Sequence, residues 1–196
     1  MALLPELKGV AGTEVGMTRV VGGLALIAGG AFWFWAALVF AGKPYGDTAT
    51  LRLIRPAEPL SSTYRSGDDA APFMALAIVL TLVGLALLYA RPAWAAGGWG
   101  KAAVVLLTAG LLVVAPWPLL LVGFLGWVFG MLALAIAALR SGLLPRSAAL
   151  MLIAAAALLF LFNTEDDRAL FLIAPGAAWI WFGATAVAKG RAALPA

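Results

Sequence analysis

Three arginines in one polar stretch of an otherwise apolar chain are the residues best suited to bind an anion. Arg52, Arg55 and Arg65 lie within residues 42–70. A guanidinium group presents several donors in a planar fork that matches a phosphate or a carboxylate. We expect this loop to contact an external ligand or a lipid head group, if any part of the chain does. In the alternative interpretation, the arginines pair with acids of the same loop: Asp47, Glu58, Asp68 and Asp69.

Acidic residues precede two of the predicted helices. Asp68 and Asp69 come before one apolar run, and Glu165, Asp166 and Asp167 come before another. Brought together, their oxygens would suit Ca²⁺ or Mg²⁺. However, their spacing matches no EF-hand, and anionic side chains at helix N-termini stabilise the helix dipole without a metal. We therefore predict no metal site, and keep Asp166 and Asp167 with the arginines as candidate ligand contacts.

The residue types that the chain lacks narrow its chemistry further. It contains no Cys and no His, so it has neither a thiolate nor the usual axial ligand of haem and the commonest ligand of zinc. It carries no P-loop, no G-x-S-x-G and no H-E-x-x-H. The net charge of +4 comes from scattered cations rather than a dense basic run. We predict no catalytic residues, no cofactor and no nucleic-acid partner.

Two aromatic clusters lie inside apolar runs. They are Trp33-Phe34-Trp35 and Trp179-Ile180-Trp181. Such rings would stack against a flat cofactor, but they more commonly pack against neighbouring helices or lipid. We predict packing.

The elements that carry these residues are membrane helices. Hydrophobic residues make up 64% of the 196 residues and charged residues 11%, whereas soluble domains average about 45–50% and about 25%. This composition predicts an all-α, polytopic membrane protein that forms a single domain over residues 1–196.

The middle of the chain sets the count of spans. Residues 102–139, between Lys101 and Arg140, are 38 residues without a charge. As a helix they would extend about 57 Å, nearly twice the hydrocarbon core of a bilayer. Pro116 and Pro118 interrupt the run and forbid a regular helix there. We therefore predict a hairpin of two spans.

Six transmembrane helices in one bundle follow from this count, joined by short connections and one external loop at 42–70. A short polar-apolar lead, residues 1–16, precedes them. Ser147 is predicted to cap the fifth helix, and Pro175 to bend the sixth. The predicted spans are residues 20–41, 72–90, 102–115, 119–139, 148–162 and 169–188.

The distribution of cations predicts the orientation. Six spans place eight Lys and Arg on the side of the termini: Lys8, Arg19, Arg91, Lys101, Arg140, Arg146, Lys189 and Arg191. Five lie on the other side: Lys43, Arg52, Arg55, Arg65 and Arg168. The positive-inside rule then places both termini in the cytoplasm. Heavy use of Arg, Ala and Gly favours a bacterial protein of the cell (inner) membrane.

The predicted spans contain no Asp, Glu, Lys or Arg in their interior. Intramembrane ionisable residues are the usual components of proton relays and ion-coupled pathways. The polar residues that remain are Thr81, Thr108 and Thr185. Each is expected to bond to the backbone of its own helix.

Small residues mark the expected helix contacts. Gly126 and Gly130 form a GxxxG motif, with Gly123 near the same face. Gly176 and Gly183 lie seven residues apart, as do the pairs Gly22-Gly23 and Gly29-Gly30. Glycines let helix backbones approach closely, which is the main packing device where lipid is as apolar as the side chains.

These observations favour a non-catalytic integral membrane protein, an accessory or structural subunit of a membrane complex. Its expected partners are membrane lipid and other membrane subunits. One alternative is a small-solute transporter or channel, which would need a polar-lined cavity around Pro175, Thr185 and Thr108. Another is a lipid-handling protein that uses the external loop.

Overall fold

The computed structural model describes residues 4–41, 70–89, 97–113, 120–141, 145–162 and 167–194. These residues form helices and no strand, so the predicted all-α fold is confirmed. The helices are α1 (Leu4–Ala41), α2 (Ala71–Leu88), α4 (Gly98–Val113), α5 (Leu120–Ser141), α6 (Arg146–Phe160), the 3₁₀ helix η1 (Asp167–Leu172) and α7 (Ile173–Arg191).

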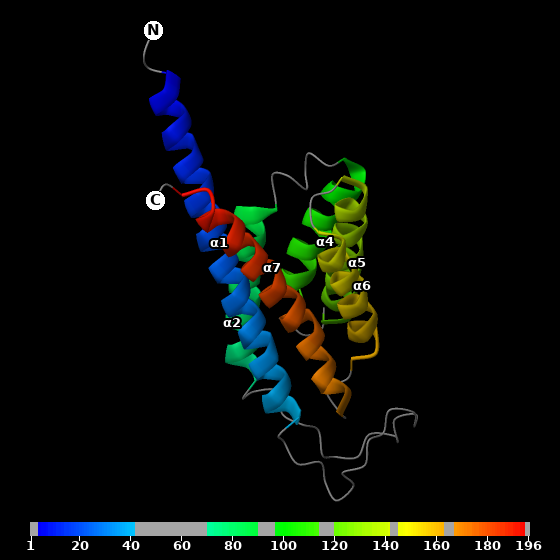
Figure 1. Cartoon of the computed structure of the whole chain (residues 1–196). Helices are drawn as coiled ribbons and strands as arrows, with labels where there is room; N and C mark the ends of the chain where they lie inside the picture. The colour runs from blue at the N-terminus through cyan, green and yellow to red at the C-terminus, as the bar shows by residue number, and fades with distance from the viewer. Residues whose placement is uncertain are drawn as a thin grey trace, which may run out of the picture.

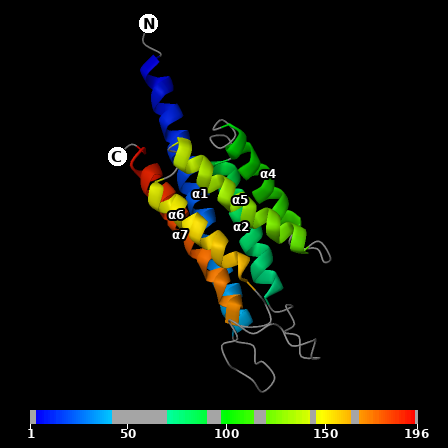
Figure 2. The ribbon, with the colours of Figure 1, turned by 90° about the vertical axis from the view of Figure 1, so that its right-hand side faces the viewer.

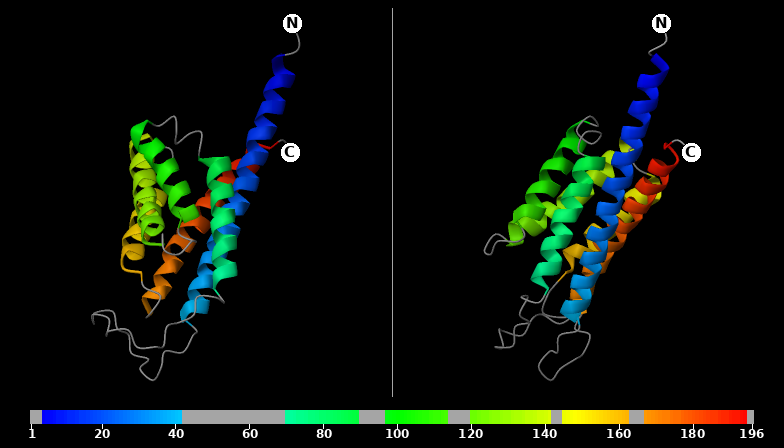
Figure 3. Two further views of the ribbon diagram at one scale, coloured as in Figure 1. Left: turned by 180° about the vertical axis from the view of Figure 1, so that it is seen from behind. Right: turned by 90° about the vertical axis from the view of Figure 1, so that its left-hand side faces the viewer.

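The α-helices alternate in direction along the chain and lie side by side (Figure 1). Because their number is even, both ends of the chain lie at the same end of the bundle, which we call the terminal end. The first turns of α1 project beyond the other helices at this end (Figures 1 and 3).

The helices pack in two groups of three. In the first group, α1 lies between α2 and α7. In the second group, α5 lies between α4 and α6, and the groups meet where α6 packs against α7 (Figure 2). Although α2 and α4 follow each other in the chain, they contact each other only slightly.

Four of the described helical segments are long and apolar enough to cross a membrane: Glu14–Val39, Ala71–Leu88, Val122–Ser141 and Leu170–Arg191. The chain is therefore a membrane-embedded protein. Two further apolar helices, α4 and α6, have 16 and 15 residues. At 1.5 Å per residue they extend about 24 Å and about 22 Å, somewhat less than a hydrocarbon core of about 30 Å.

Helix α1 begins earlier than the sequence predicted. The predicted span starts at residue 20, whereas α1 begins at Leu4 and has 38 residues. Hydropathy falls before residue 20, but nothing there breaks a helix. Pro5 lies in the first turn, where its missing N–H has no partner to lose.

One prediction about a helix end is wrong. Helix α6 is preceded by Pro145 as its N-cap, so Ser147 lies inside the first turn and does not cap it. The predicted bend at Pro175 falls where α7 begins, at Ile173. The 3₁₀ helix η1 precedes it, and Pro175 therefore falls in the first turn of α7, where proline is tolerated.

The core is apolar and contains three fully buried indoles. Trp33, Trp127 and Trp179 come from α1, α5 and α7 and are the largest side chains with almost no exposure. The rings of Trp33 and Trp127 stack with centroids 4.6 Å apart and so join the two groups. Such stacking adds to the free energy of burial.

Candidate functional site

The candidate ligand contacts predicted from the sequence lie mostly outside the described residues. Arg52, Arg55, Arg65 and Asp166 are outside them, and Asp167 is the first residue of η1. The predicted hairpin turn at Pro116 and Pro118 also lies outside them. Among the described residues, no group of three or more acidic side chains is placed to hold a metal ion.

The glycines predicted to mediate packing lie at two helix pairs. Gly126 and Gly130 of α5 lie against α4: a Cβ on Gly126 would be 3.0 Å from the Gly110 Cα, and one on Gly130 2.6 Å from the Leu107 amide nitrogen. Gly123 is buried on the same helix, and its carbonyl oxygen faces Gly110. Such separations leave no room for a side chain.

Helices α1 and α7 meet through three reciprocal glycine pairs. Gly23 faces Gly183, and a Cβ on Gly23 would lie 2.6 Å from the Gly183 carbonyl oxygen. The remaining pairs are Gly30 with Gly176 and Gly16 with Gly190. Gly16 and Gly190 were not among the predicted packing residues. Gly16 continues the spacing of seven residues toward the start of α1, and Gly190 continues it toward the end of α7. This spacing is the sequence signal that could have predicted both.

The two aromatic clusters divide between core and surface. Trp33 and Trp179 are buried, whereas Trp35 and Trp181 of the same clusters are 54% and 47% exposed. Trp179 packs against Phe182, with ring centroids 5.9 Å apart. Adjacent positions on a helix point in different directions, so each cluster contributes one core indole and one ring on the outer surface of the bundle.

Thr81 and Thr185 have hydrogen-bond partners of different kinds. The Thr185 hydroxyl donates to the Phe182 carbonyl of its own helix at 2.8 Å, as expected. Thr81 is instead fully buried, and its hydroxyl accepts a hydrogen bond from the Trp33 indole N–H at 3.3 Å. The expectation that Thr81 simply bonds to its own backbone therefore missed an interhelical contact. The indole nitrogens of Trp127 and Trp179 have no hydrogen-bond partner among the described residues.

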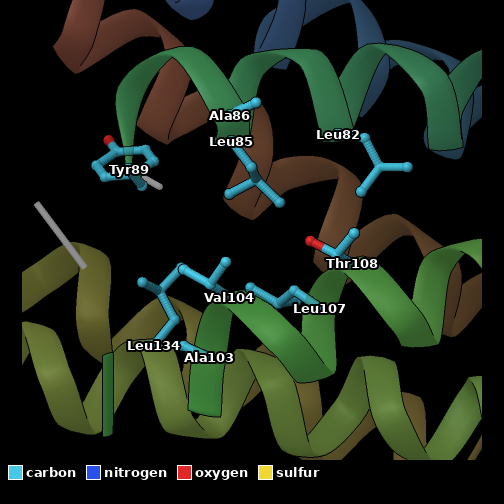
Figure 4. A pocket seen from close by; sticks show the side chains of 9 residues that line it. All are labelled: Leu82, Leu85, Ala86, Tyr89, Ala103, Val104, Leu107, Thr108 and Leu134. Carbon is cyan, nitrogen blue, oxygen red and sulfur yellow. The ribbon is translucent and has the colours of Figure 1, made fainter. Parts of the chain in front are cut away.

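A cavity of about 210 Å³ lies between α2 and α4 (Figure 4). The α2 wall consists of Leu82, Leu85, Ala86 and Tyr89. Tyr89 lies at one end of the cavity, nearest the terminal end, and its ring meets Phe182 of α7 at an interplanar angle of 80°.

The opposite wall comes from α4. It is formed by Ala103, Val104, Leu107 and Thr108, and Leu134 of α5 lies beneath it. Ala103, Leu107 and Leu134 are buried and form the floor, whereas Val104 is half-buried and Thr108 is exposed at the rim. The cavity is thus a groove with a hydrocarbon floor that opens on the outer surface of the bundle.

No pattern in the sequence predicts this groove. The residues of its α4 wall repeat at intervals of three and four, which shows only that they share a helix face. That this face lies opposite α2 with only slight contact follows from the tertiary packing. Of the three residues predicted to surround a polar cavity, only Thr108 lines the groove.

Exposed cations gather at the terminal end of the bundle. The guanidinium carbon of Arg140, at the end of α5, lies 5.6 Å from the centroid of the Trp99 ring at the start of α4. This is a cation–π distance. The exposed cations with described side chains are Arg19, Lys101, Arg140, Arg146, Lys189 and Arg191. Glu14 is the acidic residue among the side chains described at this end.

Comparison with known proteins finds no family model that matches the chain, and no curated protein or solved structure that resembles it at a significant level.

Proposed function

We propose that the chain is a non-catalytic accessory or structural subunit of a membrane complex. One observation carries this proposal: among the described residues, Thr81 is the only buried polar or charged side chain, and Trp33 already donates a hydrogen bond to it. Transfer of protons or ions through a bundle needs ionisable or polar groups along a path. A core held together by glycine contacts and indole rings suits a rigid scaffold instead.

We further propose six crossings, with α4 and α6 crossing beside the longer helices. Both are short for a full bilayer core, but the residues that flank α4 in the sequence are also apolar at 114–119, and local thinning of the bilayer accommodates a short span. The cation count favours cytoplasmic termini in the inner membrane of a bacterium.

The outer surface of the bundle is where a partner would bind. Large apolar side chains such as Trp35, Phe129 and Trp181 are exposed there. In a membrane these side chains contact lipid or another subunit. The proposal therefore predicts that part of this surface is covered in the native membrane.

The experiment that tests the proposal is extraction of the native protein in a mild detergent, followed by mass measurement of the intact particle. We expect a particle that contains a second protein in fixed stoichiometry, and expect a harsh detergent to release it. A particle that contains only this chain, at every detergent and protein concentration, would contradict the accessory role.

The groove between α2 and α4 supports a second candidate function, lipid handling. A hydrophilic solute would need a polar lining, and Thr185 and Pro175 do not line the groove. The lining is mostly hydrocarbon, with hydroxyls only at Tyr89 and Thr108. The groove therefore favours a lipophilic occupant over the small polar solute of a conventional transporter.

A further inference from the structure

The groove between α2 and α4 opens toward the medium around the bundle. Its rim includes Ala86 and Thr108, which are exposed, while its floor is buried. Because α2 is apolar throughout and long enough to span a bilayer, the medium at this depth is hydrocarbon. An empty groove would forfeit dispersion contacts along its whole lining, so hydrocarbon chains of the bilayer will enter it.

The groove is continuous with a cation on the same face of α4. Lys101, Val104 and Thr108 follow one another at intervals of three and four residues, so they lie on one side of the helix. Val104 and Thr108 line the groove. From Lys101 to Thr108 the axial distance is about 10 Å. Lys101 therefore stands just beyond the end of the groove that Tyr89 occupies.

The level of Lys101 in the bilayer is marked by its neighbours. Trp99, two residues earlier, is 45% exposed at the start of α4 and carries Arg140 over its ring. Tryptophan with basic residues at the end of an apolar helix is typical of the head-group region. A chain lying in the groove would thus have its phosphate at the level of Lys101.

We propose that the groove binds one acyl chain of an anionic phospholipid, with Lys101 holding the lipid phosphate at the terminal end of the bundle. The volume of about 210 Å³ exceeds the roughly 150 Å³ of a dry cavity that accepts benzene, so it accommodates a stretch of several methylene groups. The excess of exposed cations over acids at this end selects an anionic lipid over a zwitterionic one.

The test is a lipid titration of the purified full-length chain in detergent, read by native mass spectrometry. The probes are phosphatidylglycerol and phosphatidylcholine with identical acyl chains. We expect one phosphatidylglycerol to bind per chain, about fivefold or more tightly than phosphatidylcholine, because each cation near the head group contributes on the order of a fivefold change.

Two variants, each with a control, test separately the contact of Lys101 with the head group and the binding of the acyl chain in the groove. Lys101→Gln should weaken phosphatidylglycerol binding about fivefold, whereas the control Lys189→Gln, which removes a cation from α7 at the same end, should leave it unchanged. Ala86→Phe should fill the groove and weaken both lipids. Its control, Ala157→Phe, adds the same ring to an exposed position of α6 and should change neither.

Thermal unfolding of each variant in the same detergent checks that it is folded, and Val104→Phe serves as a second groove-filling variant if Ala86→Phe is destabilised. Binding by both groove variants at the wild-type level would overturn the proposal. Equal effects of Lys101→Gln and Lys189→Gln would do the same, as would full competition by glycerol phosphate, which has no acyl chain. The assay uses the chain alone, so its result does not depend on whether a protein partner exists.

Discussion

Thr81 shows how one polar residue is accommodated in an apolar membrane core. Its hydroxyl accepts the Trp33 indole hydrogen bond, and the Trp33 ring in turn stacks on Trp127. Through these contacts α2, α1 and α5 are tied at one level of the bundle. A buried donor such as an indole N–H costs free energy when it loses its acceptor.

At this scale we predict that Thr81→Val lowers the free energy of unfolding by about 1 kcal/mol, because the nearly isosteric change leaves the Trp33 indole without its acceptor. The measurement is the unfolding midpoint in mixed micelles with increasing SDS. Thr81→Ser, which keeps the hydroxyl, should lose less. If the serine variant were the less stable of the two, the methyl group and not the hydrogen bond would be the important feature of Thr81.

The contact between α1 and α7 explains why glycines recur at seven residues in both helices. In each of the pairs Gly16–Gly190, Gly23–Gly183 and Gly30–Gly176, a Cβ added to one glycine would approach the carbonyl oxygen of the other. A repeat of seven keeps the same face toward the partner as two helices wind around each other. The neighbouring glycines, Gly22 and Gly29, face α2 instead. Helix α1 therefore uses adjacent positions for two different partners.

At the scale of the element we predict that Gly183→Ala lowers the free energy of unfolding by about 1–3 kcal/mol, because the new methyl group overlaps the Gly23 backbone and forces the helices apart. The same SDS titration measures it. The control is Gly98→Ala at the start of α4, where an added Cβ meets nothing within 4 Å. A Gly183→Ala variant as stable as the control would show that α1 and α7 do not pack as closely as described.

The whole molecule is two three-helix groups that meet along α6 and α7 and leave a groove where α2 and α4 diverge. Both termini and the exposed cations lie at one end. We proposed above that this basic end faces the cytoplasm. In that orientation the groove would open to the cytoplasmic leaflet, where anionic lipids are available to it.

At this scale we predict that a cysteine at Ser62 reacts with a membrane-impermeant maleimide added to intact cells, and that a cysteine at Ser141 reacts only after the membrane is opened. The chain has no cysteine of its own, so each single variant reports one position. Ser141 ends α5 at the terminal end of the bundle. The reverse labelling pattern would invert the orientation and move the basic end outside.

That the chain is helical and membrane-embedded can be predicted from its residues alone. In a bilayer, backbone polar groups must be satisfied locally, so an apolar run between charges is sufficient to predict a helix. This local rule located α2 within two residues at each end, but it placed the start of α1 at residue 20 because it detects the membrane boundary and not the end of the helix.

The contacts of each helix face depend on the packing of the whole bundle. The glycine repeats indicated that close contacts exist, but not that Gly23 meets Gly183 while Gly22 meets α2. Likewise, neither the hydrogen bond from Trp33 to Thr81 nor the groove beside Val104 follows from any local pattern. The physical reason is that lipid is as apolar as the helix surfaces, so partners are chosen by the fit of shapes between residues distant in the chain, and fit is a property of the assembled bundle.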